Sequence, residues 1–486
     1  MKIAVIGSGI GGIAVACRLA AKGHNVTVFE KNLQPGGKIG ELRIEGYRFD
    51  TGPSLLTLPH MMDELLNITG GGSKHSFDYK KLEILCKYFF LNSEPLTAYA
   101  DLEKFKNECL LKFNEDPENI SRYLAKASLL YKLTSEIFLF NSLHKLKNYL
   151  KISILKSLLQ VNKLRFYNTM HYENNLSFAS RNLVQIFDRY ATYNGSNPYS
   201  APATLIVIAH LENNLGAYFP SSGMYSIVQS LSELAIQLGV DFNFNTLVDE
   251  IVIKNNKAVG IKVDEKELSF DMIVADADVK YLANNMMNHP LKKRLNRMEP
   301  SSSALVFYWG VKKVFPELDL HNILFSADYR EEFIKLFREK TIYNDPTIYI
   351  FISSKLVKDD APMNSENWFV MINAPYDTNQ DWEKLIKEAR KNIVEKINHT
   401  LNTDLEKFIE YEKIATPQTI QRNTLSQGGA LYGSASNSIF SAFLRHPNFL
   451  HRIKNLYFVG GSVHPGGGIP LCLASAKIVD NEIPAK

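Results

Sequence analysis

The alternation of apolar and polar residues predicts strands and helices from the first residues of the chain. Residues 2–6 form a short β-branched apolar run that is typical of a buried strand. A helical pattern at 13–22 follows after a glycine-rich turn, and a second apolar run at 25–29 predicts the next strand. The chain therefore begins as strand, tight turn, helix and strand.

The rest of the chain continues this mixture. Residues 60–215 are predicted to be mostly helical, with one or two strands between 82 and 99, and residues 286–415 form a strand-rich block. We predict helices at 225–238, 330–338 and 381–401, strands at 241–245, 247–254, 258–263, 270–275, 303–311, 348–353, 368–374 and 455–459, and a last helix from Ile469. The predicted fold class is α/β.

The glycines of the first turn are spaced for a dinucleotide. Gly7 permits the turn, Gly9 lets the backbone approach a pyrophosphate, and Gly12, beside Gly11, lets the helix pack closely on the strand. The phosphates can then lie on the unpaired N–H groups at the start of the helix. Glu30 ends the second strand about 20 residues later, where a carboxylate accepts hydrogen bonds from ribose hydroxyls. This context favours a nucleotide site over an ordinary glycine turn.

A second glycine pair favours FAD over NAD. Lys31 follows Glu30, and Gly36-Gly37-Lys38 comes shortly afterwards. This combination resembles the extension found in amine-oxidase-like flavoproteins, and the resemblance implies that its backbone packs on the flavin and the pyrophosphate. Taken alone, the segment could be a surface turn with a solvated lysine.

Two further segments fit the same resemblance. Gly52-Pro53-Ser54 follows a predicted strand pair around Gly46 and resembles the family's loop near the flavin. In flavoproteins of this build, the strand near Val248 places backbone groups against the adenine. We therefore add these residues to the expected FAD site.

The carboxyl-terminal glycines point to a narrower class. The strand at 455–459 ends in Gly460-Gly461, and Gly468-Ile469-Pro470 opens the last helix. Together with residues 416–422 and 428–433, this segment resembles the signature of the bacterial carotenoid (phytoene) desaturases, which are FAD-dependent oxidoreductases. In that family the segment closes the flavin site, and the resemblance covers essentially the whole chain.

Two other stretches resemble one branch of this family. Residues 46–54 and 190–199 look most similar to the enzymes that act on 1-hydroxylated acyclic carotenoids at the 3,4 position. A phytoene desaturase, or a carotenoid isomerase that uses reduced flavin, remains an alternative. Proteins that escort prenylated GTPases share the architecture and give a non-enzymatic alternative.

The resemblance implies a fold, a cofactor and a reaction. It implies a Rossmann-type FAD-binding domain like that of amine oxidases and glutathione reductase. We interpret the strand-rich block as a mixed-sheet substrate domain, and the basic, leucine-rich helical region as an insert that can face the membrane. FAD would accept a hydride at N5 from a CH–CH unit of a lipophilic carotenoid while a proton leaves. Because such a substrate has almost no polar group, positioning should matter more than a strong acid or base.

Candidates for the proton acceptor are few. We can name only Asp188 and His171, both in the predicted helical region, and such residues are more often structural. Arg189 and Glu212 are similarly placed. No metal-ligand cluster stands out in the sequence, and the four cysteines form no CxxC pair, so neither a metal site nor a disulfide framework is predicted.

Length and motif positions suggest the domain organisation. A chain of 486 residues with 45% apolar residues supports two or three domains. We assign residues 1–60, 216–285 and 416–486 to the FAD-binding domain, 61–100 and 286–415 to the substrate domain, and 101–215 to the helical insert.

Charge is distributed unevenly although the net charge is only +4. Between Arg122 and Arg165, Glu136 is the only acid among many lysines, arginines and leucines. Such a segment can lie in an anionic membrane surface, or its leucines can face the core and its lysines the water. Nucleic acid is not an expected partner, because no binding motif accompanies the basic residues.

These observations lead to an expected location. No run of about 18 apolar residues predicts a membrane span, and the chain starts directly in a predicted core strand, which leaves no room for a signal peptide. We expect a cytoplasmic protein, peripheral on the inner face of the cell membrane. Because no second glycine fingerprint for a nicotinamide cofactor follows the first, oxygen or a membrane quinone is the expected electron acceptor.

Overall fold

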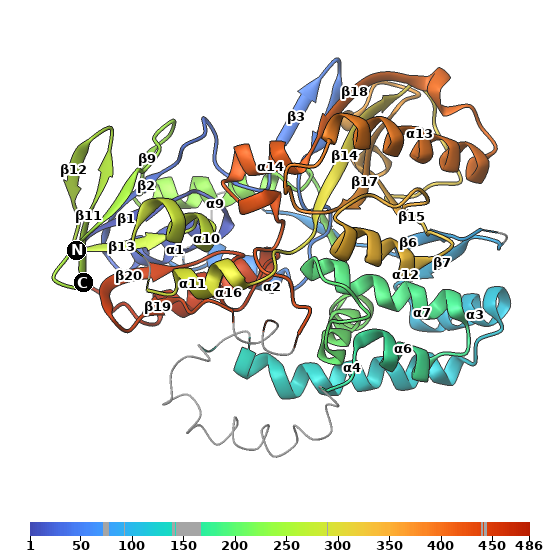
Figure 1. Ribbon diagram of the computed structural model, residues 1–486, viewed down its shortest axis with the longest axis horizontal. Helices are drawn as coiled ribbons and strands as arrows, with labels where there is room; N and C mark the ends of the chain where they lie inside the picture. Colours follow the sequence, from blue (N-terminus) through green and yellow to red (C-terminus); the bar gives the residue numbers. More distant parts are fainter. Residues whose placement is uncertain are drawn as a thin grey trace.

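Two β-sheets lie side by side in the computed structural model, with a group of helices beneath the second (Figure 1). The structure describes residues 1–70, 77–91, 93–138, 141, 167–288, 290–438, 441 and 445–486. The two chain ends lie close together beside the first sheet (Figure 1), and the backbone N–H of Lys486 donates to the carbonyl oxygen of Lys22.

The first sheet has a parallel centre built from distant parts of the chain. Its parallel strands, in spatial order, are β20 (Ile453–Phe458), β13 (Met272–Ala275), β1 (Lys2–Ile6), β2 (Asn25–Phe29) and β9 (Asp241–Asn243). Helix α1 (Ile10–Ala21) packs on β1 and β2, and α9 (Ser226–Gln237) and α16 (Ile469–Asp480) both pack on α1. Because helices cover such a sheet, its strands read as continuous apolar runs. This confirms the predicted Rossmann-type arrangement.

An antiparallel meander extends the edge of this sheet. It consists of β10 (Glu250–Lys254), β11 (Lys257–Val263) and β12 (Lys266–Ser269), and the short β19 (Phe449–Leu450) pairs with β20. The predicted strand 247–254 begins later than expected, so Val248 precedes β10. The reason is that the preceding Thr246 donates its N–H to the carbonyl oxygen of Glu30, which ties this segment to the end of β2.

The second sheet is mixed, as predicted. Its order is β18 (Ile409–Ala415), β14 (Ser303–Val311), β17 (Glu366–Ala374), β16 (Ile348–Ile352), β15 (His321–Leu324), β6 (Ile84–Phe89) and β7 (Leu96–Tyr99), and only β15 and β6 pair in parallel. The predictions missed β18 as a separate strand, because three charged residues interrupt the apolar residues of its sequence IEYEKIA at the edge of the sheet.

Alternation along these strands divides their side chains between two cores. Phe307, Trp309 and Ile350 lie in the cluster that includes residues of α13 (Trp382–Leu401). Tyr308 and Phe369 belong to the large cluster shared with the first sheet and the helices. The second sheet therefore presents an aromatic face toward the interior of the molecule.

Helices fill the described residues between 101 and 215. They include α3 (Leu102–Phe113), α4 (Pro117–Phe138), α6 (Met170–Ser177) and α7 (Arg181–Asp188), followed by short 3-10 and π turns, with η3 (Arg189–Asn194), η4 (Ala203–Ile206), α8 (Val207–Ala209) and η5 (His210–Leu215). In α4 the apolar residues Tyr123, Leu124 and Leu130 are buried, so this part of the basic stretch faces the core. Residues 139–140 and 142–166, which hold most of that stretch, lie outside the described residues.

The remaining elements differ from the predictions mainly at their ends. Helix α1 starts at Ile10 because Gly9 already acts as its N-cap. The predicted helix 330–338 is α12 (Tyr329–Ile334) followed by the π turn η7 (Lys335–Glu339). The other short elements are β3 (Glu41–Ile44), β4 (Tyr47–Asp50), α2 (His60–Leu66), β5 (Tyr79–Lys81), β8 (Tyr218–Pro220), α10 (Val279–Tyr281), η6 (Leu282–Met286), α11 (Lys292–Arg297), η8 (Ser353–Lys355), η9 (Lys358–Asp360), η10 (Leu405–Phe408), α14 (Pro417–Thr424) and η11 (Gln427–Gly429).

Candidate functional site

The first glycine turn leaves the start of α1 open. Gly7 has φ +94°, and a Cβ on Gly12 would lie 2.2 Å from the carbonyl oxygen of Gly7, so no larger side chain fits at Gly12. The N-cap Gly9 provides no side-chain acceptor for the first N–H groups of the helix. These groups, with Gly11 among them, are available to an anion.

Glu30 stands beside this turn, as the sequence predicts. Its Oε2 accepts hydrogen bonds from the backbone N–H (2.9 Å) and the hydroxyl (2.8 Å) of Ser8, and its Oε1 accepts one from the N–H of Asn32 (2.9 Å). Val248 is buried in the core cluster that contains Phe29. At Val248 itself, only the backbone can therefore face a nucleotide.

The second glycine pair packs directly on the first turn. The N–H of Gly36 donates to the carbonyl oxygen of Ser8 at 2.8 Å, and a Cβ on Gly37 would lie 3.2 Å from Cα of Gly9. Lys31 donates from Nζ to the carbonyl oxygen of Arg422 at 2.7 Å. The amino-terminal loop is thus held against a segment close to the carboxyl terminus.

Lys38 makes the same connection more tightly. Its Nζ donates to the carbonyl oxygens of Ala430 (3.0 Å) and Leu431 (2.6 Å). Burial lowers its pKa, and the carboxylate of Asp278 opposes this shift. A Cβ on Gly52 would lie 2.1 Å from the carbonyl oxygen of Lys38, so the predicted flavin loop lies directly on this residue.

That loop is also joined to the second sheet. After Gly52 and Pro53, the hydroxyl of Ser54 lies 2.5 Å from the hydroxyl of Tyr349 on β16. The Tyr349 hydroxyl in turn lies 2.8 Å from Nδ1 of His321 on β15. The sequence predicted the loop, but it gave no indication of this link.

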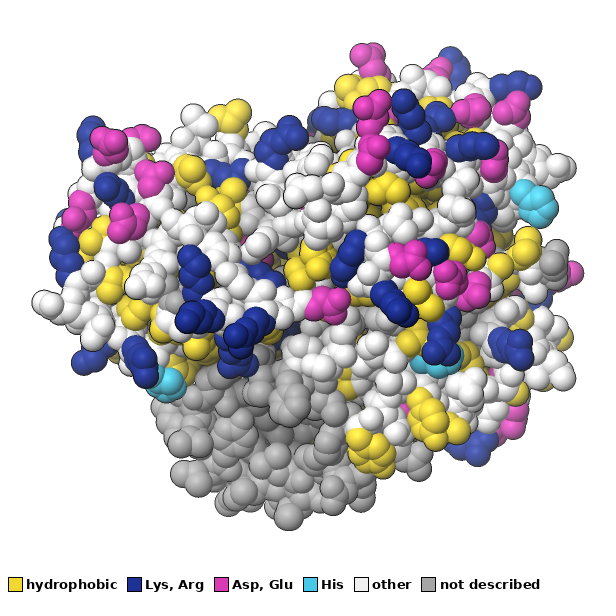
Figure 2. Space-filling view, in the orientation of Figure 1, with side chains coloured by type: hydrophobic (Ala, Val, Ile, Leu, Met, Phe, Trp, Pro, Cys, Tyr) yellow, Lys and Arg dark blue, Asp and Glu magenta, His cyan; other side chains and the backbone are white. Residues whose placement is uncertain are grey.

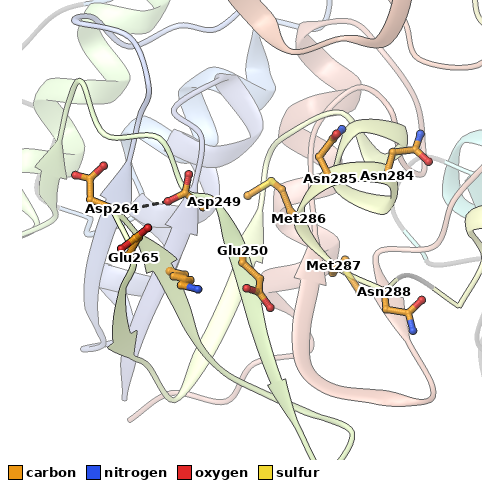
Figure 3. A pocket seen from close by; sticks show the side chains of 10 residues that line it. Asp249, Glu250, Asp264, Glu265, Asn284, Asn285, Met286, Met287 and Asn288 are labelled. Carbon is orange, nitrogen blue, oxygen red and sulfur yellow. Dashed lines mark hydrogen bonds between the residues drawn. The ribbon is translucent and has the colours of Figure 1, made fainter.

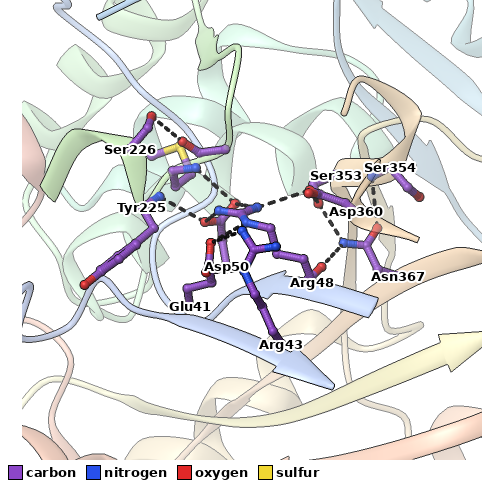
Figure 4. A network of polar contacts seen from close by, with 12 residues as sticks. Glu41, Arg43, Arg48, Asp50, Tyr225, Ser226, Ser353, Ser354, Asp360 and Asn367 are labelled. Carbon is purple, nitrogen blue, oxygen red and sulfur yellow. Dashed lines mark hydrogen bonds and ion pairs between the residues drawn. The ribbon is translucent and has the colours of Figure 1, made fainter. Parts of the chain in front are cut away.

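A buried ion network fixes the start of the loop (Figure 4). Arg48 donates to Asp50 at 2.8 Å, to Asp360 at 3.2 Å and to Glu41 at 2.5 Å. Asp50 also accepts the backbone N–H groups of Met224 and Tyr225, each at 3.0 Å, at the start of α9. Arg48 thus joins β4 to η9 (Lys358–Asp360), and through Asp50 it is linked to the start of α9.

The carboxyl-terminal motif forms a second uncapped helix start beside the first. The N-cap of α16 is Gly468, with φ +107° and no atom within 4 Å of a Cβ placed on it. Ile469 is buried, and Pro470 lies in the first turn. A Cβ on Gly11, in the first turn of α1, would lie 2.8 Å from the backbone N of Gly460, and one on Gly461 would lie 3.3 Å from Cα of Gly467, so two helix starts without side-chain caps lie in one site.

Gly460 and Gly461 connect β20 to this helix. Gly460 has φ +92°, and a Cβ on it would lie 2.1 Å from Oδ1 of Asp276. Arg445, which the sequence analysis missed, donates to the carbonyl oxygens of Tyr432 (2.8 Å) and Gly461 (3.3 Å). It therefore ties the glycine segment to the segment around Tyr432.

Asp276 was also missed, although the sequence carried a signal. It directly follows β13, which pairs in parallel with β1, so its side chain emerges at the same edge as the glycine turn. Burial raises the pKa of Asp276 to about 7, and Glu30 adds to this rise, whereas the N–H groups of Gly12 and Gly9 and the charge of Lys38 lower it.

The site fits FAD. Two uncapped helix starts, glycines whose Cβ atoms would clash and Glu30 at the end of β2 form a cradle for a pyrophosphate and a ribose. Cys472, the one cysteine near the cradle, has its pKa raised to about 12 by burial and therefore stays a thiol. Among the described residues, no group of three His, Cys, Asp or Glu side chains could hold a metal ion.

His171 and Asp188 come together elsewhere, in the helical region. Nδ1 of His171 lies 2.6 Å from Oδ2 of Asp188, whose Oδ1 accepts a hydrogen bond from Asn174 at 2.8 Å. Arg189 and Glu212 form a separate buried ion pair at 3.3 Å among tyrosine hydroxyls. Because Arg189 and Glu212 are buried and bonded to each other and to tyrosine hydroxyls, this second pair is typical of a structural ion pair.

A surface hollow of about 610 Å³ lies outside the cradle. Figure 3 shows acidic residues on its β-strand side and the segment 284–288 on the other. Acidic and amide side chains suit neither a pyrophosphate nor a polyene, and none of the predicted FAD residues lines this hollow.

The fold and the cradle define a flavin-dependent oxidoreductase. The model of the flavin containing amine oxidoreductase family matches residues 10–482, and the chain belongs to this family. FAD as the cofactor and the predicted fold class are thereby confirmed, whereas the membrane-facing role of the insert stays a prediction.

Sequence relatives narrow the class. The chain is 48% identical over 484 residues to a 1-hydroxycarotenoid 3,4-desaturase of Flavobacterium sp. (strain P99-3), which covers 99% of both chains. It is 32% identical to a 4,4'-diaponeurosporene oxygenase of Staphylococcus haemolyticus (100% of this chain, 97% of the other) and 30% identical to a phytoene desaturase of Fusarium fujikuroi (99% and 89%). The resemblance to carotenoid desaturases is confirmed.

Solved structures agree on the fold. Putrescine oxidase bound to putrescine matches with a TM-score of 0.66 at 11% identity, covering 100% of both chains. A fatty acid isomerase from P. acnes matches with a TM-score of 0.63 at 13% identity, covering 99% of this chain and 98% of the other.

Proposed function

We propose that this protein introduces the 3,4 double bond of 1-hydroxylated acyclic carotenoids. The observation that carries this proposal is the 48% identity to a 1-hydroxycarotenoid 3,4-desaturase along nearly the full length of both chains. When bound in the cradle, FAD supplies the two-electron acceptor for the hydride. The residues of this chain bind FAD, hold the polyene and remove the proton.

The aromatic face of the second sheet is the proposed support for the polyene. The ring centroids of Tyr308 and Phe369 are 5.6 Å apart, and those of Phe351 and Phe369 are 6.3 Å apart. Phe219 adds another ring at 5.7 Å from Phe351. These rings meet edge to face, and together they form an apolar aromatic wall against which a conjugated chain can pack. The link from Ser54 to Tyr349 connects this face with the predicted flavin loop.

His321 is the proposed recognition group for the hydroxyl. It is buried, its Nδ1 is engaged with Tyr349, and its Nε2 has no hydrogen-bond partner among the described residues. Burial and the charge of Arg189 lower the pKa of His321 to about 3, so the ring is neutral. A hydroxyl both donates and accepts, so it can pair with Nε2 in either tautomer. Because C1 is two carbons from C3, a group that binds this hydroxyl must lie near the flavin.

His171 is the proposed proton acceptor, with Asp188 as its positioning partner. Since Nδ1 faces the Asp188 carboxylate at 2.6 Å, the ring can accept a proton at Nε2 while the carboxylate stabilises the resulting charge. In this role the ring of His171 contacts the substrate.

Contact with the cytoplasmic face of the membrane is proposed for delivery of the carotenoid. Helix α11 exposes Lys292, Lys293 and Arg297, and Figure 2 shows basic side chains gathered over it, at the lower left. Such a patch suits anionic lipid headgroups. Within the described part of the chain, no helix is long and apolar enough to cross a bilayer. Oxygen or a membrane quinone is the proposed final acceptor.

The test uses the protein loaded with FAD and liposomes that carry either a 1-hydroxy acyclic carotenoid or phytoene. A red shift of the absorption maximum with the hydroxylated compound alone supports the proposal. A shift with phytoene alone assigns a phytoene desaturase, and a new isomer without net oxidation assigns an isomerase. An added oxygen atom in the product, detected by mass spectrometry, assigns an oxygenase. Protein that binds FAD but changes no carotenoid supports a binding role.

A further inference from the structure

The carboxylate of Asp276 lies among the glycines that form the pyrophosphate cradle. A Cβ placed on Gly9 would lie 2.5 Å from Oδ2 of Asp276. A Cβ on Gly11 would lie 2.8 Å from Oδ1, and one on Gly460 2.1 Å from the same atom. The carboxylate is therefore in contact with both glycine segments, at the start of α1.

This position places two acids at one anion site. Oδ2 of Asp276 is buried at the turn of α1, where the N–H groups of Gly9 and Gly12 are near enough to lower the pKa of the carboxyl, but among the described residues none completes a hydrogen bond to Oδ2. Of the titratable groups that act on Asp276, Glu30 at the end of β2 is acidic and Lys38 is basic, and Cys472 on α16 is an uncharged thiol. A pyrophosphate bound at the backbone N–H groups that open α1 would bring further negative charge close to both carboxylates.

We propose that Asp276 takes up one proton when FAD binds. The physical reason is that like charges sharing a site cannot both remain ionised at low cost, so the phosphates favour the protonated carboxyl. A protonated carboxyl can also donate a hydrogen bond to a phosphate oxygen, which an ionised one cannot do. Asp276 is thus a cofactor-binding residue that makes FAD affinity depend on pH.

The direction of the pH dependence follows from linkage. The folded protein without FAD has a pKa of about 7 at Asp276, and bound phosphates raise it further. Below pH 7 the proton is already present, so affinity is constant. Between pH 7 and the higher pKa of the complex, each binding event must draw a proton from solution, and the dissociation constant for FAD rises by up to about tenfold per pH unit.

The experiment titrates the apoprotein with FAD between about pH 5.5 and 8.5 and follows quenching of flavin fluorescence. The comparison is between wild type, Asp276→Asn and Asp359→Asn. Asp359 is an exposed carboxylate on η9, so the control removes the same charge from a solvent-exposed position. We expect the dissociation constant of wild type and Asp359→Asn to rise above pH 7, whereas that of Asp276→Asn stays flat and is at least tenfold lower than wild type at pH 8.5.

A second measurement needs no variant. Calorimetric titration of wild type at pH 8 in buffers with different ionisation enthalpies gives the number of protons taken up, and we expect a value close to one. A flat affinity for wild type, no proton uptake, or an unchanged slope in Asp276→Asn would overturn the proposal. Because neither measurement uses a carotenoid, their outcome is independent of the proposed desaturation.

Discussion

Nζ of Lys38 lies 2.6 Å from the carbonyl oxygen of Leu431, across 393 positions of sequence. This hydrogen bond closes the amino-terminal glycine loop onto the segment that leads to the last strand and helix. It shows how a cofactor site can be formed from both ends of a chain while a complete second sheet lies between them.

Replacing Lys38 with methionine should weaken FAD binding by about 10- to 100-fold. The variant leaves two carbonyl oxygens without their donor, and an unsatisfied buried polar group costs about 1–3 kcal/mol. Fluorescence titration with FAD measures the effect. Lys31→Met is the matched control, since Lys31 binds one carbonyl oxygen at a more exposed place, and it should change affinity less than about threefold. Equal affinities for both variants would contradict the role of Lys38.

Gly460→Ala should abolish FAD binding at micromolar concentrations. The added methyl group would overlap Asp276 Oδ1, at 2.1 Å, and the backbone has φ +92°. Gly23→Ala separates the two causes, because Gly23 has φ +82° while the nearest atom to its Cβ is 3.7 Å away. That control should lose about 1 kcal/mol of stability from backbone strain and keep its flavin spectrum. A yellow Gly460→Ala protein would show that this turn tolerates a side chain.

Arg48→Met should lower the free energy of unfolding by about 3–5 kcal/mol. The substitution leaves the buried carboxylates of Asp50 and Asp360 without their counterion, which is the costly way to break a buried network. Urea unfolding of the apoprotein measures this. Arg43→Met removes an exposed partner of Glu41 and should cost less than about 1 kcal/mol. A similar loss of unfolding free energy in both variants would mean that the buried ion network does not depend on Arg48.

His321→Phe should reduce the preference for hydroxylated over unhydroxylated carotenoid by about 10- to 100-fold. Phenylalanine keeps the stacking on Phe351, with ring centroids 5.4 Å apart in the wild type, but it cannot pair with a hydroxyl. The measurement is the ratio of kcat/KM for the two substrates, with the FAD spectrum as a check on folding. Tyr308→Phe, on the same aromatic face, is the control and should keep the ratio. An unchanged ratio in His321→Phe would remove His321 from substrate recognition.

His171→Asn should lower kcat by about 10²- to 10⁴-fold with little change in substrate affinity, if the ring accepts the proton. Asp188→Asn should have a smaller effect and change the pH profile of kcat, because it alters the group that positions the ring. Rapid mixing with carotenoid followed by flavin bleaching measures the reduction step directly. A bleaching rate equal to that of wild type in His171→Asn would show that the pair is structural.

The glycine turns were predictable because their chemistry is local. Gly7, Gly9 and Gly12 are required by one tight turn and one helix start, and a strand, a helix and Glu30 surround them in the sequence itself. The same holds for Gly468 and Pro470 at the start of α16. Element ends were less predictable, as at Val248, because a tertiary hydrogen bond from Thr246 decides where β10 begins.

The sequence by itself determined the class of cofactor, because glycines, prolines and β-branched runs set the short-range backbone geometry of the cofactor site. Only the tertiary structure decided which side chains share the site. Asp276 reaches the cradle because β13 pairs with β1, Lys38 finds its acceptors far along the chain, and His321 meets Ser54 through Tyr349. Such contacts depend on strand order and on the packing of two sheets, and no local pattern of residues encodes either.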